Sequence, residues 1–309
     1  EYDQIVSVGE LLSTKIVSAY LNKEGYANKW LDARDFIKTD NSYRNARVDW
    51  QLSAAEIQQR IKKGSVHLTQ GFIGCTSENF STTLGREGSD FSAAILAHAL
   101  DASEVVIWKD VPGVLNADPR FFDDAQLLET ITYSEAIELA YFGAKVIHPK
   151  TIQPLKNKNI PLRVRSFLDE ELQGTVISEG VKIHPFLPSF IVKDNQILIS
   201  ISAKDLSFIV EDHLSHIFSL FAMSNVSVNV MQNSAVSFTV CVDDDKNKIP
   251  ALIEALKQQY KVYYNQGLVL HTIRHYNSAS VEKVRAQREV LLEQKSRSTV
   301  RLVFESQKN

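Results

Sequence analysis

A glycine-punctuated loop at residues 82–90, Thr-Thr-Leu-Gly-Arg-Glu-Gly-Ser-Asp, carries the residues best suited to chemistry. It follows an apolar stretch at 66–74 and precedes a run of small residues typical of a helix. Gly85 and Gly88 allow the backbone to approach a ligand closely, and the start of the helix offers unpaired N–H groups to an anion. Arg86 adds a planar guanidinium that can bind a carboxylate or phosphate through two hydrogen bonds. The loop therefore predicts a site for a small anionic molecule.

A plainer interpretation of the same loop is an ordinary strand–helix turn. In that case Ser89 caps the helix and Arg86 lies in solvent. The loop is not a P-loop, because no Gly-Lys-Ser/Thr sequence closes it, and it does not match the dinucleotide fingerprint Gly-x-Gly-x-x-Gly. Taken alone, this segment leaves both interpretations open.

Two further segments could contribute to a ligand site. Apolar residues at 104–108 predict a buried strand, and a charged, turn-rich loop at 109–120 follows it directly. Ligands of open α/β sheets bind beyond the carboxyl ends of the strands. Acids of this loop could therefore meet a metal ion or a ribose, and its bases a polyphosphate. The alternatives are a solvated loop and, for Lys145 after the expected helix at 133–142, a simple helix C-terminal cation.

The elements that must position these residues alternate between helix and strand through residues 1–168. Such alternation predicts an α/β domain with a largely parallel sheet sandwiched by helices. Residues 169–189 are rich in glycine, proline and acids, and they predict a linker between domains. Apolar spacing gives the expected elements: strands at 5–9, 66–72, 105–108 and 162–167, and helices at 11–21, 54–63, 91–101 and 133–142.

The second half of the chain predicts α+β units of ferredoxin-like order. Residues 190–266 form a βαββαβ pattern, which resembles that of an ACT unit, and 267–309 form a second, abbreviated unit. The expected strands are 197–202, 226–231, 236–242, 261–264, 268–274, 290–293 and 299–304, and the expected helices are 211–224, 248–260 and 281–286.

Composition limits the possible functions. The chain has 309 residues, of which 44% are hydrophobic, and this is enough for two domains with cores. A net charge of −3 offers no basic face for nucleic acid. Cys75 and Cys241 lie far apart and form no metal or redox motif, so we expect reduced thiols in a cytoplasmic protein. No apolar run has the length of a membrane span, and the eight histidines show no zinc-site spacing.

The chain resembles the aspartokinases in six ordered motifs that extend over nearly its whole length. That resemblance implies an amino-acid-kinase fold followed by ACT regulatory units. It also implies ATP-dependent phosphorylation of the side-chain carboxylate of L-aspartate to 4-phospho-L-aspartate, for the lysine, threonine and methionine pathways. The motifs are Gly-Glu-Leu-Leu-Ser at 9–13, Gly-Phe-Ile-Gly at 71–74, the loop at 82–90, Trp-Lys-Asp-Val-Pro-Gly at 108–113, Asp-Pro-Arg at 118–120 and Gly-Ala-Lys-Val-Ile-His-Pro at 143–149.

The chemistry of such a reaction requires positioning more than proton transfer. A substrate carboxylate is already ionised at pH 7, so the enzyme must hold two anions in line and neutralise charge on the transferred phosphoryl group. On this resemblance, Arg86 would bind the substrate α-carboxylate and Asp90 would order the cations around the phosphoryl group. Glu10 would receive the α-ammonium group, Phe72 would form a wall of the pocket, and Ser89 would hydrogen-bond substrate or phosphate.

The nucleotide and effector sites follow from the same resemblance. Mg²⁺ would be carried mainly by the ATP phosphates. An amino-acid effector, lysine or threonine, would bind between ACT units of a homodimer. The residues expected at the nucleotide are Lys109, Asp110, Leu115, Asp118, Arg120 and Lys145, and those expected at the effector are Asn225, Val226, Ser227, Val228 and Asn229.

Several positions depart from the family pattern. Glu87 stands where many aspartokinases have glycine, Lys109 where many have threonine, and Leu115 where a tyrosine is frequent. Asn229 and Ala235 replace acids of the lysine-sensitive members. The family's N-terminal Lys-Phe-Gly-Gly strand is not found, so we expect this chain to be the later part of a longer protein. Its last residues suggest a monofunctional enzyme.

Two other functions fit parts of the sequence. The first is another kinase of the same fold, which would act on acetylglutamate, glutamate or a nucleoside monophosphate. The second is a non-catalytic amino-acid sensor built from the ACT units, or a dimerisation scaffold without a ligand.

Overall fold

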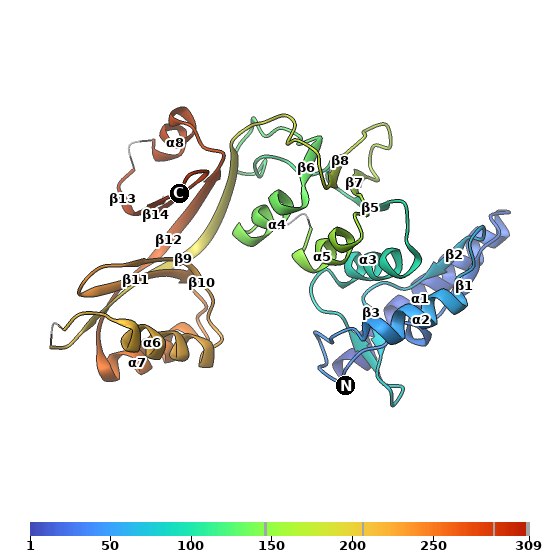
Figure 1. Ribbon diagram of the computed structural model, residues 1–309, viewed down its shortest axis with the longest axis horizontal. Helices are drawn as coiled ribbons and strands as arrows, with labels where there is room; N and C mark the ends of the chain where they lie inside the picture. Colours follow the sequence, from blue (N-terminus) through green and yellow to red (C-terminus); the bar gives the residue numbers. More distant parts are fainter. Residues whose placement is uncertain (145–146, 206, 287, 307–309) are drawn as a thin grey trace. The chain divides into compact units, whose positions relative to one another are not determined.

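The computed structural model describes residues 1–144, 147–205, 207–286 and 288–306, which form two compact units (Figure 1). Unit 1 comprises Glu1–Leu115 and Leu127–Phe186. Unit 2 comprises Asn116–Gln126 and Leu187–Asn309, so a short segment of the first half of the chain belongs to the second unit.

Unit 1 begins with a 22-residue helix, α1 (Tyr2–Lys23), and the expected strand at 5–9 is wrong. A short apolar run cannot be told from part of a helix by its pattern alone. The helix buries small polar residues and exposes large apolar ones: Asp3, Ser7 and Ser18 are buried, whereas Ile5 is 71% exposed. The apolar character of this run therefore did not indicate burial.

The remaining elements of the first half of unit 1 surround one apolar core. Parallel strands β1 (Lys29–Leu31) and β2 (His67–Thr69) pair with each other, and β3 (Ile73–Cys75) forms an antiparallel pair with β4 (Ser81–Thr83). Helices α2 (Trp50–Arg60) and α3 (Gly88–Leu100) complete this part, together with the 3-10 turn Ala33–Asp35. The fully or almost fully buried side chains of the core are Ala33, Phe36, Ile37, Ile57, Ile73, Leu84, Ile95 and Ala99.

The second half of unit 1 is built on a four-stranded sheet in the order β5-β7-β8-β6. Strand β5 (Val105–Lys109) runs parallel to β7 (Leu162–Ser166), and β6 (Thr130–Thr132) runs parallel to β8 (Thr175–Ser178), while β7 and β8 are antiparallel. Two helices belong to this part, α4 (Tyr133–Phe142) and α5 (Pro149–Asn157).

The segment expected as a linker, 169–189, contributes β8 to this sheet. Gly174 explains why its composition was misleading. A Cβ atom at Gly174 would lie 1.9 Å from the Val164 carbonyl oxygen, and the residue has a φ of +70°. Glycine is therefore needed where the chain approaches the backbone of β7 closely just before β8 begins.

Unit 2 is a six-stranded sheet in the order β10-β11-β9-β12-β14-β13. Its two central strands, β9 (Ser189–Ala203) and β12 (Tyr260–Arg274), each have 15 residues and run antiparallel to each other. The other elements are helices α6 (Glu211–Met223), α7 (Ile249–Gln259) and α8 (Ser278–Arg285) and strands β10 (Val228–Asn233), β11 (Ser237–Asp243), β13 (Val290–Lys295) and β14 (Thr299–Glu305).

The first βαββαβ unit forms as expected, but the second shares its central strands with the first. Strands expected separately at 261–264 and 268–274 are one strand, β12, with irregular pairing between Asn265 and Leu270. Residues 189–193 of β9 pair with the second half of β12 and supply a strand to the second unit, which the sequence pattern had left abbreviated. A residue pattern shows where a strand lies but not which partner it pairs with.

Cys75 and Cys241 are both free and buried. Among the helices of the described ranges, none combines the length and the apolar character that crossing a membrane requires.

Unit 2 contains a buried histidine that makes its stability sensitive to pH. His271 of β12 is 9% exposed, and burial together with the nearby Arg288 lowers its pKa from 6.5 to about 4. The folded state therefore keeps His271 neutral at a pH where the unfolded chain protonates it. The stabilisation is complete above pH 6.5 and is lost as the pH falls toward 4.

We expect the free energy of unfolding of unit 2 to fall by up to about 3 kcal/mol over this range. Urea titrations at pH 7.5 and pH 4.5 measure the loss, and His271→Leu should reduce it. His184→Gln is the control, because the His184 side chain is 67% exposed. Equal pH dependence in His271→Leu and the parent protein would contradict this explanation.

Candidate active site

A cavity of about 650 Å³ in unit 1 brings the predicted substrate-binding residues together. Glu10 comes from α1, Phe72 from the turn between β2 and β3, and Arg86 and Ser89 from the loop that enters α3. These residues are up to 79 positions apart in the sequence, and all four line the same cavity. The full lining is Tyr2, Glu10, Arg44, Phe72, Thr83, Gly85, Arg86, Glu87, Gly88 and Ser89.

The glycines of the loop are required by close approaches inside this cavity wall. Gly85 has a φ of +82°, and a Cβ there would lie 2.7 Å from Asn45 Oδ1. A Cβ at Gly88 would lie 2.7 Å from Cδ2 of Phe72. The loop thus packs directly on the Phe72 ring, which is the wall expected from the sequence.

Phe72 is held in a backbone conformation that bulky residues rarely adopt. Its φ is 71°, in the left-handed region where a Cβ is disfavoured. Three hydrogen bonds fix the segment: the Phe72 N–H donates to Ser92 Oγ (2.9 Å), Ser92 Oγ–H donates to the Gly88 carbonyl (3.0 Å), and the Leu84 N–H donates to the Phe72 carbonyl (2.9 Å). Such strain persists only where the surroundings impose it, and it is frequent at binding sites.

Helix α3 starts at this cavity without a side-chain cap. Its N-cap residue is Glu87, and no side chain accepts a hydrogen bond from the first turn. The N-cap is therefore Glu87 and not, as the plainer interpretation expected, Ser89, whereas the Arg86 side chain is exposed, as that interpretation also expected. An uncapped first turn leaves N–H groups and a partial positive charge available to an anion.

An ion pair connects the start of α3 to the end of β5. Lys109 Nζ lies 2.9 Å from Asp90 Oδ2, and Asp90 is 8% exposed. Asp90, predicted to be catalytic, therefore contacts Lys109, which is one of the residues predicted to bind the nucleotide. Asp110 follows it and is exposed, and Leu115 makes an isolated bridge with Leu127.

Asp118 and Arg120 belong to unit 2, because they lie on the segment Asn116–Gln126. The Arg120 guanidinium donates to both carboxylate oxygens of Asp118, with an Nη2–Oδ2 distance of 2.6 Å. This pair raises the pKa of Arg120. Lys145, the last predicted nucleotide residue, lies outside the residues that the structure describes.

The segment predicted to bind an effector leads into the edge strand β10. The Asn229 side chain is held by three partners: its amide donates to Gln196 Oε1 (2.8 Å) and Asp243 Oδ1 (2.9 Å), and its oxygen accepts from Lys193 Nζ (2.8 Å). Before it, Val226 and Val228 pack against the core of α6 and α7, whereas Ser227 is exposed and Asn225 has a φ of 52°. An effector bound at this segment would therefore contact the exposed Ser227 and would lie near the Lys193 ammonium group beside Asn229.

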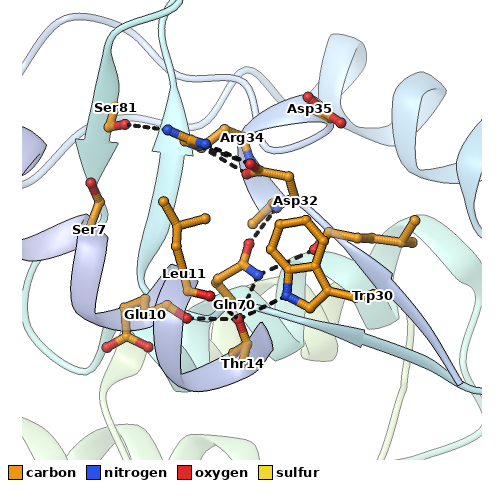
Figure 2. Close-up of polar contacts among 12 residues, drawn as sticks. Ser7, Glu10, Leu11, Thr14, Trp30, Asp32, Arg34, Asp35, Gln70 and Ser81 are labelled. Atoms are coloured by element: carbon orange, nitrogen blue, oxygen red, sulfur yellow. Dashed lines mark hydrogen bonds and ion pairs between the residues drawn. The ribbon is translucent and has the colours of Figure 1, made fainter. Parts of the chain in front are cut away.

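Sequence reasoning missed the network that holds Glu10 in place (Figure 2). Gln70 is 1% exposed; its amide donates to Thr14 Oγ1 (2.8 Å) and its oxygen accepts from the Ala33 N–H (2.8 Å). Thr14 Oγ1–H in turn donates to the Glu10 carbonyl (2.7 Å), and Trp30 Nε1–H donates to Thr14. The Glu10 carboxylate points away from this network. The feature of the sequence that could have indicated this network is Gln70, a polar residue directly after strand β2.

A second missed residue is Asp3, a carboxylate that is 1% exposed. It accepts hydrogen bonds from the N–H groups of Thr83 (2.7 Å) and Arg44 (2.9 Å), and from the Thr83 hydroxyl (3.2 Å). Thr83 and Arg44 both line the cavity. Asp3 therefore ties α1 to the cavity wall without lining the cavity itself.

Asp3→Ala should destabilise unit 1 by about 2–3 kcal/mol, because it leaves the buried N–H group and hydroxyl of Thr83 without their acceptor. Urea unfolding measures this loss. The matched control is Asp123→Ala, since Asp123 is exposed, and we expect a change within about 0.5 kcal/mol for it. If both variants unfold at the same urea concentration as the parent, Asp3 does not hold the cavity wall.

Comparison with known proteins shows the family and the fold of the chain. The model of the amino acid kinase family matches residues 1–166, and the chain belongs to that family. Within it, the similar curated proteins are aspartokinases. "Lysine-sensitive aspartokinase 3" of Escherichia coli is 34% identical over 279 residues, which are 87% of this chain and 62% of that protein. "Aspartokinase 2, chloroplastic" of Arabidopsis thaliana is 34% identical over 83% of this chain and 50% of its own length.

Solved structures extend the likeness to both units. E. coli aspartokinase III in complex with aspartate and ADP superimposes with a TM-score of 0.81 at 28% identity, covering 98% of this chain and 72% of that one. The aspartate kinase of Clostridium acetobutylicum gives a TM-score of 0.84 at 25% identity, covering 99% and 73%. The fold is thus that of an amino-acid-kinase domain with a C-terminal regulatory region, as the sequence predicted. The chain spans less than two thirds of the length of the two curated relatives named above.

Proposed function

We propose that this chain is the substrate-binding and regulatory part of an aspartokinase, which transfers the γ-phosphoryl group of ATP to the side-chain carboxylate of L-aspartate. The observation that carries the proposal is the cavity lined by Glu10, Phe72, Arg86 and Ser89, beside the Asp90–Lys109 pair. It lies in a fold shared with an aspartokinase solved with aspartate and ADP.

The residues of the cavity suit a zwitterionic dicarboxylate. The Arg86 guanidinium can donate two parallel hydrogen bonds to the α-carboxylate, and the Glu10 carboxylate can neutralise the charge of the α-ammonium group. The reacting carboxylate would then lie near the uncapped start of α3, where N–H groups face developing negative charge. Because that carboxylate is already ionised at pH 7, no general base is required.

Lys109 would supply a positive charge to the phosphoryl group, and Asp90 fixes its ammonium group. For Mg²⁺, the described residues contain no group of three or more acidic, histidine or cysteine side chains able to hold a metal ion. We propose that the phosphates of ATP supply most of the ligands for Mg²⁺, as such sites commonly bind it. When bound, Mg²⁺ neutralises phosphate charge.

An assay that traps the product tests this proposal. The full-length protein, given ATP, Mg²⁺ and L-aspartate in hydroxylamine, should form aspartyl hydroxamate, because an acyl phosphate reacts with hydroxylamine. Omission of aspartate is the control. Aspartate binding without any hydroxamate would instead support the amino-acid sensor.

We further propose that unit 2 binds an amino-acid effector, lysine or threonine, at residues 225–229 in a homodimer. The support is the exposed Ser227 before an edge strand whose Met231 is 50% exposed. The cation Lys193 beside Asn229 disfavours a second positive charge there. Sedimentation of the full-length protein, together with its activity against each effector, tests both parts. A monomer that neither amino acid inhibits would leave unit 2 without this role.

A further inference from the structure

Glu87 is a residue of the loop 82–90 whose backbone conformation is unusual for a residue with a side chain. Its φ is 52°, in the left-handed region where side chains with a Cβ are disfavoured and glycine is not. Backbone strain at a binding site points to a role for the side chain.

The Glu87 carboxylate neither caps helix α3 nor accepts a hydrogen bond at its Oε2 atom from a described residue. Although Glu87 is the N-cap residue of α3, its side chain caps no N–H group. Its Oε2 atom is buried and accepts no hydrogen bond from any residue in the described ranges. A buried carboxylate oxygen without a donor is costly, and the cost is removed if a ligand supplies the donor.

The neighbouring His148 contributes little positive charge beside the Glu87 carboxylate. His148 accepts a hydrogen bond from the Lys150 N–H at its Nδ1 atom (3.1 Å) as the N-cap of α5. Burial, with Lys150 and Arg86 nearby, lowers the pKa of His148, against the opposing effect of Glu87. Burial and the two nearby cations thus disfavour the protonated form of His148.

Glu87 also lines the same cavity as Glu10. The cavity thus contains two carboxylates, Glu10 and Glu87, and two guanidinium groups, Arg44 and Arg86. This balance of charges matches a ligand that carries both an ammonium group and carboxylates. An ammonium group has three N–H donors, so it can serve two carboxylates at once.

We infer that Glu87 is a specificity-determining residue, which together with Glu10 binds the α-ammonium group of the amino-acid substrate. This inference rests on the proposed function. Its consequence is that the chain selects amino acids over dicarboxylates of the same length that lack the ammonium group, because only the former supply a donor to Oε2.

The test compares L-aspartate with succinate, which lacks only the ammonium group. In the full-length protein, Glu87→Gln should raise the KM for aspartate about tenfold, which is the size of one lost charge-assisted hydrogen bond. The inhibition constant of succinate should change by less than about twofold, since it makes no contact that needs the charge. Glu78→Gln, a change at an exposed carboxylate, is the control and should leave both constants unaltered.

Glu87→Gly provides a second variant that removes the side chain and also the backbone strain. It should raise the KM for aspartate as Glu87→Gln does, while its Tm stays equal to or above that of the parent. An unchanged KM for aspartate in both variants would overturn the inference, and so would an equal rise in the aspartate and succinate constants. A parent protein without aspartate-dependent turnover would instead overturn the proposed function, so the two failures are distinguishable.

Discussion

Replacement of Asp90 by asparagine is expected to lower the kcat of the full-length protein about a hundredfold, with a smaller effect on the KM for aspartate. Asp90 is 8% exposed and its Oδ2 atom lies 2.9 Å from Lys109 Nζ. The neutral amide cannot hold the ammonium group by charge, so Lys109 loses its position toward the phosphoryl group. Steady-state kinetics with varied aspartate and ATP separates kcat from KM.

A double-mutant cycle shows whether Asp90 acts through its ion pair. If it does, the double variant Asp90→Asn, Lys109→Met should be no slower than the slower single variant, because the two residues act as a unit. Multiplicative losses would indicate that Asp90 acts independently of Lys109. A kcat equal to that of the parent in Asp90→Asn would remove Asp90 from the catalytic residues.

Replacement of Arg86 by alanine is expected to raise the KM for aspartate by about 10- to 100-fold, equivalent to about 1.5–3 kcal/mol for a charge-assisted contact. Arg86 lines the cavity together with Tyr2 and Glu10 of α1, and no other described residue of the loop 82–90 carries a guanidinium. Arg86→Lys should recover only part of the affinity, because an ammonium group lacks the planar fork.

The matched control is Arg60→Ala, which removes an arginine that pairs with Glu56 on the surface of α2. We expect its KM to remain within about twofold of the parent, because surface ion pairs contribute little. If Arg86→Ala also stays within this range, Arg86 does not bind the substrate carboxylate.

The loop 82–90 could be predicted as a binding site because all the residues that indicate it are close together in the sequence. Residues 82–90 carry the glycines, Arg86 and the helix start within nine positions, and the structure places them on one cavity wall. Glu10 and Phe72 could be added only through the family resemblance, because neither residue type indicates a site by itself. Their convergence on the cavity depends on how α1 and β3 pack, which no local pattern contains.

The expectations that failed depend on tertiary context. Ile5 and Val8 are exposed on α1 whereas Ser7 between them is buried, so burial could not be inferred from composition. The pairing of β9 with both halves of β12 is a long-range property, and so is the inclusion of Asn116–Gln126 in unit 2. Asp3 and Gln70 were missed because a buried polar residue shows its role only through its partners.

The central claim is that this protein phosphorylates L-aspartate, and competition between acceptors tests it most directly. The full-length protein is given ATP, Mg²⁺ and equal concentrations of L-aspartate, L-glutamate, N-acetyl-L-glutamate and UMP, and the products are quantified by mass spectrometry. We predict that 4-phospho-L-aspartate, trapped as its hydroxamate, dominates the products, and that Arg86→Ala abolishes this preference. Phosphorylation of another acceptor in preference to aspartate, or no phosphorylated product, would contradict the assignment.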